Sequence, residues 1–489
     1  MTKHRIFGLI TALVLMCALS VSAAAFSDVP STHWAAPEIS RCAELGFFQG
    51  ETADTFGLKK PITRAAFATA LCRFFGWDTA ASTATPYGDV PESKWYAGAV
   101  SAAYVHGAVT AQSEAFRPMD PITREEMAVM LIRALGYGEI AGLAQDLPHP
   151  FTDVSTNGGY ITMAYDLGLI TGTTAATFSP DTAATREQAA VILMRLYDKL
   201  HAAPPAAMAI VDDETVSLEG YDIVAIPAGQ LSAAGKKAVY SSVMKDSKAQ
   251  AIASAAKGTV LLHVTAKAAS LAKMDPAQAA ERLSKAVADG GYDGLLLDIP
   301  GAGADGRSKL TALARSVNSL LGSKSFYLVA EAPTRSGKPY DGYDYAALAA
   351  HTDRLVLRTA AAVNTDTSIP TAPVDPVEEV YYALSSLKKI DNLTLMVTIE
   401  GSAWRQKRQS ESLIGQELEQ LLADGAQRYY SGRFQCAYLR TENGLTVWYL
   451  DEEAAAHRLQ LMGLMGVDSF CLTSAAGVSD SVLSTLEIR

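Results

Sequence analysis

The sequence has few cysteines and few charged residues for its length. Five cysteines in 489 residues, with no Cys-X-X-Cys pair or histidine-rich stretch, point to no metal or cofactor. Lysine and arginine number 41 against 52 acidic residues, and the net charge of −11 argues against a broad nucleic-acid-binding surface. Hydrophobic residues make up 49% of the chain, so it has enough apolar side chains for several folded domains.

Beyond residue 25 the sequence has no apolar run long enough to span a membrane. Residues 1–25 combine a basic start, an apolar stretch over 6–19 and small residues at 22–25. This pattern is typical of a signal peptide cleaved before Phe26, with an uncleaved anchor as the alternative. Export permits disulfides, so a Cys42–Cys72 or Cys436–Cys471 pair stays open, although the helical patterns around Cys42 and Cys72 favour buried free thiols.

Two short motifs recur three times in the first 200 residues. The first centres on an Asp-Val pair at Asp28, Asp89 and Asp153, and the second is a Thr-Arg pair at Arg64, Arg124 and Arg186. The threonine before each arginine is a natural helix N-cap, and Thr123 with Glu126 and Thr185 with Gln188 fit a capping box. We therefore predict three helix–loop–helix repeats, each too small to bury its apolar face alone, packed into one helical unit.

These motifs resemble the S-layer homology (SLH) family over about residues 26–200. The resemblance implies a pseudo-threefold unit that binds secondary cell-wall polysaccharide, often through a pyruvylated amino sugar. It implies binding positions at an Asp and a Trp of the first motif, a central Gly and the Arg of the second. The matching residues are Asp28, Trp34, Gly50 and Arg64 in repeat 1, Asp89, Trp95 and Arg124 in repeat 2, and Asp153, Gly172 and Arg186 in repeat 3.

The copies depart from the family pattern in ways that make the three sites unequal. Ala111 replaces the glycine in repeat 2, repeat 3 has no matching Trp, and the glutamate of the second motif survives only as Glu126. If the residues of each site come from one repeat, they predict that Arg124 contributes more to wall binding than Arg186 does. A structural alternative is that the aspartates cap loops, the tryptophans are core and the arginines are solvated, but an arginine at a helix start suits a ligand carboxylate.

After a Pro- and Ala-rich linker at 202–206, the pattern changes to apolar runs separated by helical stretches. The runs are 208–211, 222–226, 259–264, 294–299, 326–330, 354–357, 393–399 and 469–472. Eight runs with little alternation over about 280 residues predict a parallel (β/α)8 barrel of the TIM type. The expected domains are a signal peptide (1–25), repeats at 26–86, 87–148 and 149–201, the linker, and a barrel at 207–489.

The run from Asp293 to Pro300 resembles the fourth-strand motif of family 18 glycoside hydrolases, the chitinase-like barrels. The resemblance implies acidic residues along the strand and a catalytic glutamate at its end. Asp293 and Asp298 match, but Leu296 replaces the middle acid and Pro300 the glutamate. A Tyr-Asp pair expected after the sixth strand is replaced by Ala360-Ala361. Because proline has no proton to give, we predict that the barrel is non-catalytic.

Other acids end strand runs and are weak catalytic candidates beside Asp298. Glu331 follows the fifth run and Glu400 the seventh, near Trp404, a candidate sugar platform. The sequence favours a wall-anchored surface protein with an inactive, glycan-binding barrel. A wall-anchored glycoside hydrolase with displaced carboxylates and an S-layer structural component are the alternatives. Each places the protein outside the cell, at the wall or S-layer.

Overall fold

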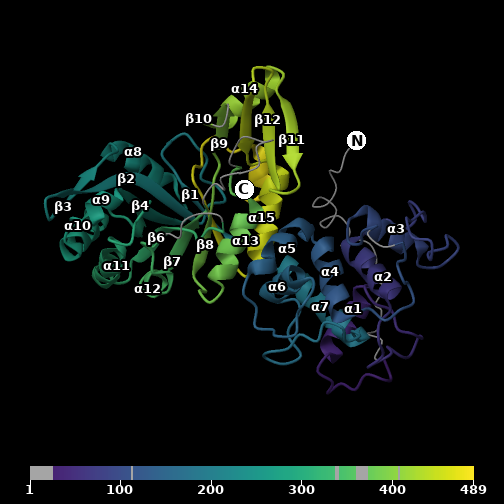
Figure 1. The fold of residues 1–489 in the computed structure, drawn as a ribbon. Coiled ribbons are helices and arrows are strands. Elements are labelled where there is room, and N and C mark those ends of the chain that lie inside the picture. The colour runs from purple at the N-terminus through teal and green to yellow at the C-terminus, as the bar shows by residue number, and fades with distance from the viewer. Residues whose placement is uncertain (1–25, 112–113, 336–340, 360–372, 406–407, 489) are drawn as a thin grey trace. The chain divides into compact units, whose positions relative to one another are not determined.

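The computed structural model describes residues 26–111, 114–335, 341–359, 373–405 and 408–488. The proposed signal peptide and Ala360-Ala361 lie outside these residues. The chain forms two compact units: the first runs to Tyr197, apart from the short stretches 142–146 and 166–168, and the second begins at Asp198. Figure 1 colours the chain by residue number.

The first unit is built from helices, with the Thr-Arg motifs at helix starts. Its helices are α1 (Ala36–Glu44), α2 (Arg64–Phe75), α3 (Ala97–Val105), α4 (Arg124–Ala134), α5 (Gly138–Leu143), α6 (Gly158–Asp166) and α7 (Arg186–Leu200). The 3-10 turn η1 (Ala144–Asp146) falls in the excluded stretch 142–146. Thr63 caps α2, and Thr123 forms a complete capping box with Glu126 at α4. At α7 Gln188 accepts from the Thr185 backbone, but the Thr185 hydroxyl has no partner among the described residues.

Short backbone pairings join the three repeats in a ring. Ile62 N donates to Ala184 O, Ala184 N to Ile122 O, and Ile122 N back to Ile62 O, at 2.8–3.0 Å. Three isolated β-bridges accompany these bonds. The unit is therefore helical with a small β-type centre, where we expected helices alone, and each second motif contacts the two other copies.

The second unit contains the predicted barrel. Its eight parallel strands are β1 (Ala206–Ile210), β2 (Ile223–Ala234), β4 (Thr259–Ala266), β5 (Gly294–Asp298), β6 (Ser325–Glu331), β7 (Arg354–Arg358), β8 (Leu393–Val397) and β14 (Ser469–Leu472). They follow the order β1-β14-β8-β7-β6-β5-β4-β2, and β2 pairs with β1 to close the barrel. Each strand corresponds to one of the eight apolar runs.

The helices of this unit depart from eight regular βα units. They include α8 (Asp246–Ala255), α9 (Ala268–Leu271), α10 (Pro276–Asp289), α11 (Arg307–Leu321), α12 (Tyr345–Ala349), α13 (Val377–Ser386), α15 (Glu452–Leu464) and α16 (Asp480–Thr485). The segment between β1 and β2 has turns and no helix. β2 continues beyond the barrel into an antiparallel hairpin with β3 (Lys237–Ser242).

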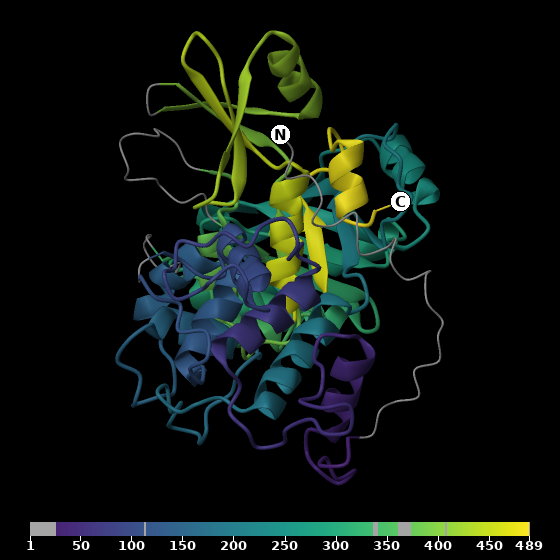
Figure 2. The same ribbon diagram turned by 90° about the vertical axis from the view of Figure 1, so that its right-hand side faces the viewer.

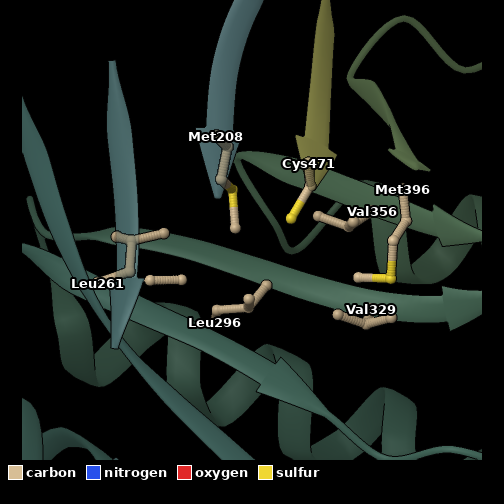
Figure 3. Packing of buried hydrophobic residues seen from close by; sticks show 8 residues of the cluster. Met208, Leu261, Leu296, Val329, Val356, Met396 and Cys471 are labelled. Atoms are coloured by element: carbon tan, nitrogen blue, oxygen red, sulfur yellow. The ribbon is translucent and has the colours of Figure 1, made fainter. Parts of the chain in front are cut away.

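One buried side chain from each strand fills the middle of the barrel (Figure 3). This layer is Met208, Ala225, Leu261, Leu296, Val329, Val356, Met396 and Cys471. Side chains in a strand alternate in direction, so the residue two places further on faces inward nearer the carboxyl end. We call the carboxyl ends of the eight strands the barrel mouth. Above Leu261, Leu296, Val329 and Val356 this rule places His263, Asp298, Glu331 and Arg358.

A second sheet is inserted between β8 and α15, and the sequence reading missed it. Its strands are β9 (Gly401–Arg405), β10 (Arg408–Leu413), β11 (Gln427–Ser431), β12 (Cys436–Arg440) and β13 (Leu445–Tyr449), in the antiparallel order β10-β9-β13-β12-β11. Helix α14 (Gly415–Ala423) lies beside this sheet (Figure 2) and contributes to the core on that face.

The four cysteines of the described chain are all free and buried. Burial raises the pKa of Cys42, Cys72 and Cys471 to about 12. These thiols are therefore protonated at neutral pH and serve as small core residues, so neither candidate disulfide is present.

Candidate functional site

Each motif arginine contacts the repeat that follows its own, in cyclic order. The guanidinium Nε of Arg64, Arg124 and Arg186 donates to Phe116 O, Phe178 O and Phe56 O at 2.7–2.8 Å. Each guanidinium carbon also lies 4.7–5.0 Å from the ring centre of the same phenylalanine. The arginines are therefore held at the junctions between repeats by hydrogen bonds and cation–π contacts, and are not solvated.

The three motif aspartates hold the loop that carries that phenylalanine. Asp28 accepts from the backbone N–H groups of Phe56, Gly57 and Leu58 at 2.7–2.9 Å. Asp89 and Asp153 accept from the two equivalent N–H groups of their own repeats. Burial raises the pKa of Asp28, but these backbone donors outweigh it and leave the pKa below its usual value. The aspartates thus have the loop-capping role.

The tryptophans of the candidate sites are exposed, whereas the glycines are closely surrounded by their own loops. Trp34 and Trp95 are 59% and 64% exposed, so they are not core residues. Gly50 and Gly172 lie in turns so tight that an added Cβ would come within 2.4 Å of a backbone oxygen. The two glycines are therefore required by the loop itself. The tryptophans remain available to an external ligand.

The ring of contacts regroups the candidate sites across repeats. Arg186 adjoins the loop of repeat 1, which keeps Asp28, Trp34 and Gly50, whereas Arg124 adjoins repeat 3, which lacks the Trp. Our grouping by repeat was therefore wrong, because each arginine reaches out of its own repeat.

The three arginines also differ in charge partners. Arg64 Nη1 lies 3.0 Å from Glu126 Oε1, and Glu126 also pairs with Arg117, beside a cavity of about 180 Å³. Within the described ranges, no carboxylate lies within 4 Å of the Arg124 or Arg186 guanidinium. Each of those two donates a second hydrogen bond, from Nη2 to Thr171 O or Gln49 O, at 2.6–2.7 Å.

At the barrel mouth, Arg358 joins two buried carboxylates. Its Nη1 lies 3.1 Å from Asp298 Oδ1 and 3.2 Å from Glu331 Oε1, and its Nη2 bonds to Asp298 Oδ2. His263 Nε2 lies 3.8 Å from Asp298 Oδ2, which is too far for a hydrogen bond. The barrel mouth therefore contains an internally paired cluster of two acids and one arginine.

The two acids of this cluster have opposite pKa shifts. Burial raises the pKa of Asp298, but His263 and the Arg358 hydrogen bonds outweigh it and hold the pKa below its usual value. Burial raises the pKa of Glu331, and Arg358 only partly offsets this, while the negative charge of Asp298 adds to the rise. Asp298 is thus the ionised member, and Glu331 keeps its proton to higher pH.

The remaining residues of the strand motif have structural positions. Asp293 accepts from Val260 N at 2.9 Å before β5 begins, which is a capping role. Leu296 is fully buried in the barrel core, where an acid would have no partner. Pro300 lies exposed in the turn after β5.

Glu400 and Trp404 belong to different surroundings. Glu400 is half-buried and accepts from the hydroxyl of Thr473, at the end of β14. Trp404 lies on β9, where it packs against a cluster around Trp448 and donates to Ser402 Oγ at 2.7 Å. Trp404 therefore contributes to the packing of the inserted sheet, and Glu400 bonds to the end of the barrel.

The sequence reading missed Arg358 and His263. Arg358 is the last residue of β7, but the predicted run stopped at residue 357, and His263 was one polar residue inside an apolar run. Counting two places on from each core residue of the barrel identifies both.

Comparisons with known proteins agree with this division of the chain. The S-layer homology domain matches residues 25–68, 86–128 and 150–190. An endoglucanase of Bacillus sp. (strain KSM-635) is 34% identical over 180 residues, and a surface layer protein of Brevibacillus choshinensis is 31% identical over 147. These alignments cover 36% and 28% of this chain but only 19% and 13% of the two relatives.

The barrel resembles a solved enzyme in fold. A chitinase from Chromobacterium violaceum superposes with a TM-score of 0.51 at 16% identity, covering 58% of this chain and 98% of that one. The chain thus contains three S-layer homology repeats and a chitinase-like TIM barrel. With its surface-layer relatives, this places the protein at the cell wall or S-layer. No described helix is long and apolar enough to cross a membrane.

Proposed function

We propose that this protein is anchored to the cell wall by its repeats, which bind secondary cell-wall polysaccharide, and that it displays a non-catalytic, glycan-binding barrel. The observation that carries the proposal is the pair of arginines at the repeat junctions. Arg124 and Arg186 are held in place by carbonyl groups, yet have no carboxylate within ion-pair distance in the described chain. The pyruvyl carboxylate of a wall sugar would supply that partner.

The proposed inactivity of the barrel rests on its missing proton donor. Pro300 occupies the position that the family resemblance gives to the catalytic acid, and Asp298 is ionised and bound to Arg358. Loss of a general acid alone typically slows hydrolysis by ~10²–10⁴-fold. A carboxylate held by an arginine is better suited to binding a sugar hydroxyl than to donating a proton.

Wall binding is tested with the full chain and purified cell walls. We expect retention on intact walls and release once the wall polysaccharide has been extracted. The double variant Arg124→Ala/Arg186→Ala should lose retention, and Arg73→Ala, on the exposed side of α2, should keep it. Equal retention on walls freed of the polysaccharide would reject this ligand.

A second candidate function is a glycoside hydrolase with a displaced acid. The observation favouring it is the opposite pKa shift of neighbouring Glu331 and Asp298, a pattern typical of an acid paired with an ionised partner. The full chain is assayed with labelled chitin oligomers and peptidoglycan glycan strands. Absence of turnover is the result we expect. Turnover that Glu331→Gln or Glu400→Gln abolishes would replace the non-catalytic proposal with this one.

A further inference from the structure

A cavity of about 420 Å³ lies on the outer wall of the barrel. Strands β2 and β3 and helices α8 and α10 surround it, and Figure 1 shows these elements gathered at one side of the barrel. Tyr292 lines the cavity two residues before β5 begins, whereas Asp298 ends that strand at the barrel mouth. The cavity and the mouth are therefore separate sites.

Two tyrosine rings are held in this cavity by glycines. A Cβ at Gly229 would come within 2.9 Å of the Tyr240 ring, and a Cβ at Gly290 within 2.3 Å of the Tyr292 ring. Neither phenol hydroxyl has a hydrogen-bond partner among the described residues. Burial raises the pKa of both phenols, so both are protonated and able to donate at neutral pH.

Polar groups on the two helices complete the lining. Arg282 on α10 and Gln250 on α8 line the cavity, and neither side chain has a hydrogen bond or ion pair in the described chain. Lys285 pairs with Asp289 at 2.7 Å, and the negative charge of Asp246 acts on both phenols. The two cations and two acids cancel in formal charge, so the cavity offers donors and acceptors without net charge.

We propose that this cavity is a glycan-binding site for a neutral hexose unit or disaccharide. Sugar hydroxyls both donate and accept, which suits an aspartate, an amide, a guanidinium and two phenols together. The tyrosine rings offer apolar surface to the sugar, and the volume falls within the ~300–1,000 Å³ of ligand pockets. The balanced charge disfavours a polyanion. The site would bind a glycan on the side of the barrel, independently of any binding or catalysis at the barrel mouth.

The test titrates the full chain with cellobiose and with N,N′-diacetylchitobiose as probes, by calorimetry. We expect saturable binding of at least one. Arg282→Ala should weaken it about tenfold or more, since a hydrogen bond to a charged group is lost. Ala253→Trp, which fills the cavity from α8, should abolish it. The matched control is Arg315→Ala, an exposed arginine on α11 outside the cavity.

Three outcomes would overturn the assignment. These are no saturable binding of either probe up to ~10 mM, binding that survives both cavity variants, and tighter binding of galacturonic acid than of the neutral sugars. If Ala253→Trp lowers the melting temperature, Gln250→Ala replaces it, because Gln250 is exposed on its helix. All of these variants leave the barrel mouth and the repeats intact. Failure here is thus distinguishable from failure of wall binding or of binding at the mouth.

Discussion

Arg358 bonds to both Asp298 and Glu331, and only the first of these acids has its charged form favoured. Because the pKa of Asp298 is lower when folded, its contribution to stability is present above the unfolded pKa and is lost as pH falls through the folded value. We expect Asp298→Asn to cost about 2 kcal/mol or more at neutral pH, since it leaves Arg358 short of a charge partner. Urea midpoints from pH 7 down to pH 3 should show this difference shrinking. Asp293→Asn is the comparison. A difference that grows on acidification would contradict the assignment.

Glu331 should show the opposite pH dependence. Its pKa is raised in the folded state, so the fold binds this proton more tightly than the unfolded chain does. Stability from this group is therefore present below the unfolded pKa and is lost as pH rises through the folded value. Glu331→Gln mimics the protonated form, so the wild type should lose stability relative to this variant between pH 4 and pH 7. A stability difference that stays constant over this range would show that Glu331 titrates normally.

Single residues show what the sequence was able to reveal. Glu331 was found because it follows an apolar run whose end becomes the barrel mouth, and Asp298 because its strand resembles the family 18 motif. Loop capping by Asp28 was one of two alternatives at the sequence level, and the sequence could not decide between them because the partners are backbone groups 28–30 residues away. The contacts of the motif arginines were also hidden, because they depend on how the repeats pack.

At the scale of elements, the eight buried strands were predictable and the inserted sheet was not. Buried parallel strands read as apolar runs, whereas β9, β11 and β12 are only five residues long and include partly or fully exposed positions. Trp404 was therefore taken for a mouth residue, although it packs within the inserted sheet. Counting apolar runs predicts strands only, so it could not show that the segment between β1 and β2 has no helix.

The core layer of the barrel explains why the strand motif cannot be restored one residue at a time. Leu296 packs among seven apolar neighbours from the other strands. We expect Leu296→Asp to destabilise the protein by about 3 kcal/mol or more, because it buries an unpaired polar group and removes an apolar one. Leu296→Met should cost under ~1.5 kcal/mol. Denaturant unfolding of both variants checks this. Equal stabilities would mean that the layer is less closely packed than its burial indicates.

At the scale of the whole molecule, the ring of repeats changes which residues share a binding site. Arg124 and Arg186 each donate Nε and Nη2 to two carbonyls of the next repeat, so their alanine variants lose the same internal bonds. Any difference in wall binding must then come from the facing loop. Arg186 adjoins repeat 1, with its exposed Trp34, whereas repeat 3 offers Arg124 no tryptophan.

We therefore expect Arg186→Ala to weaken wall binding more than Arg124→Ala does, the reverse of the order that grouping by repeat suggested. A lost charge-assisted hydrogen bond alone corresponds to ~10–150-fold in affinity, and an indole beside it adds stacking on the sugar. Titration of purified wall polysaccharide with both variants, matched in melting temperature, measures the order. Adding Trp34→Ala to Arg124→Ala should then lower the affinity further, whereas adding it to Arg186→Ala should change the affinity little. The reason is that Trp34 and Arg186 share one site, so the loss of Arg186 already removes most of the binding energy to which Trp34 contributes. Strictly additive effects would place Trp34 and Arg186 in separate sites.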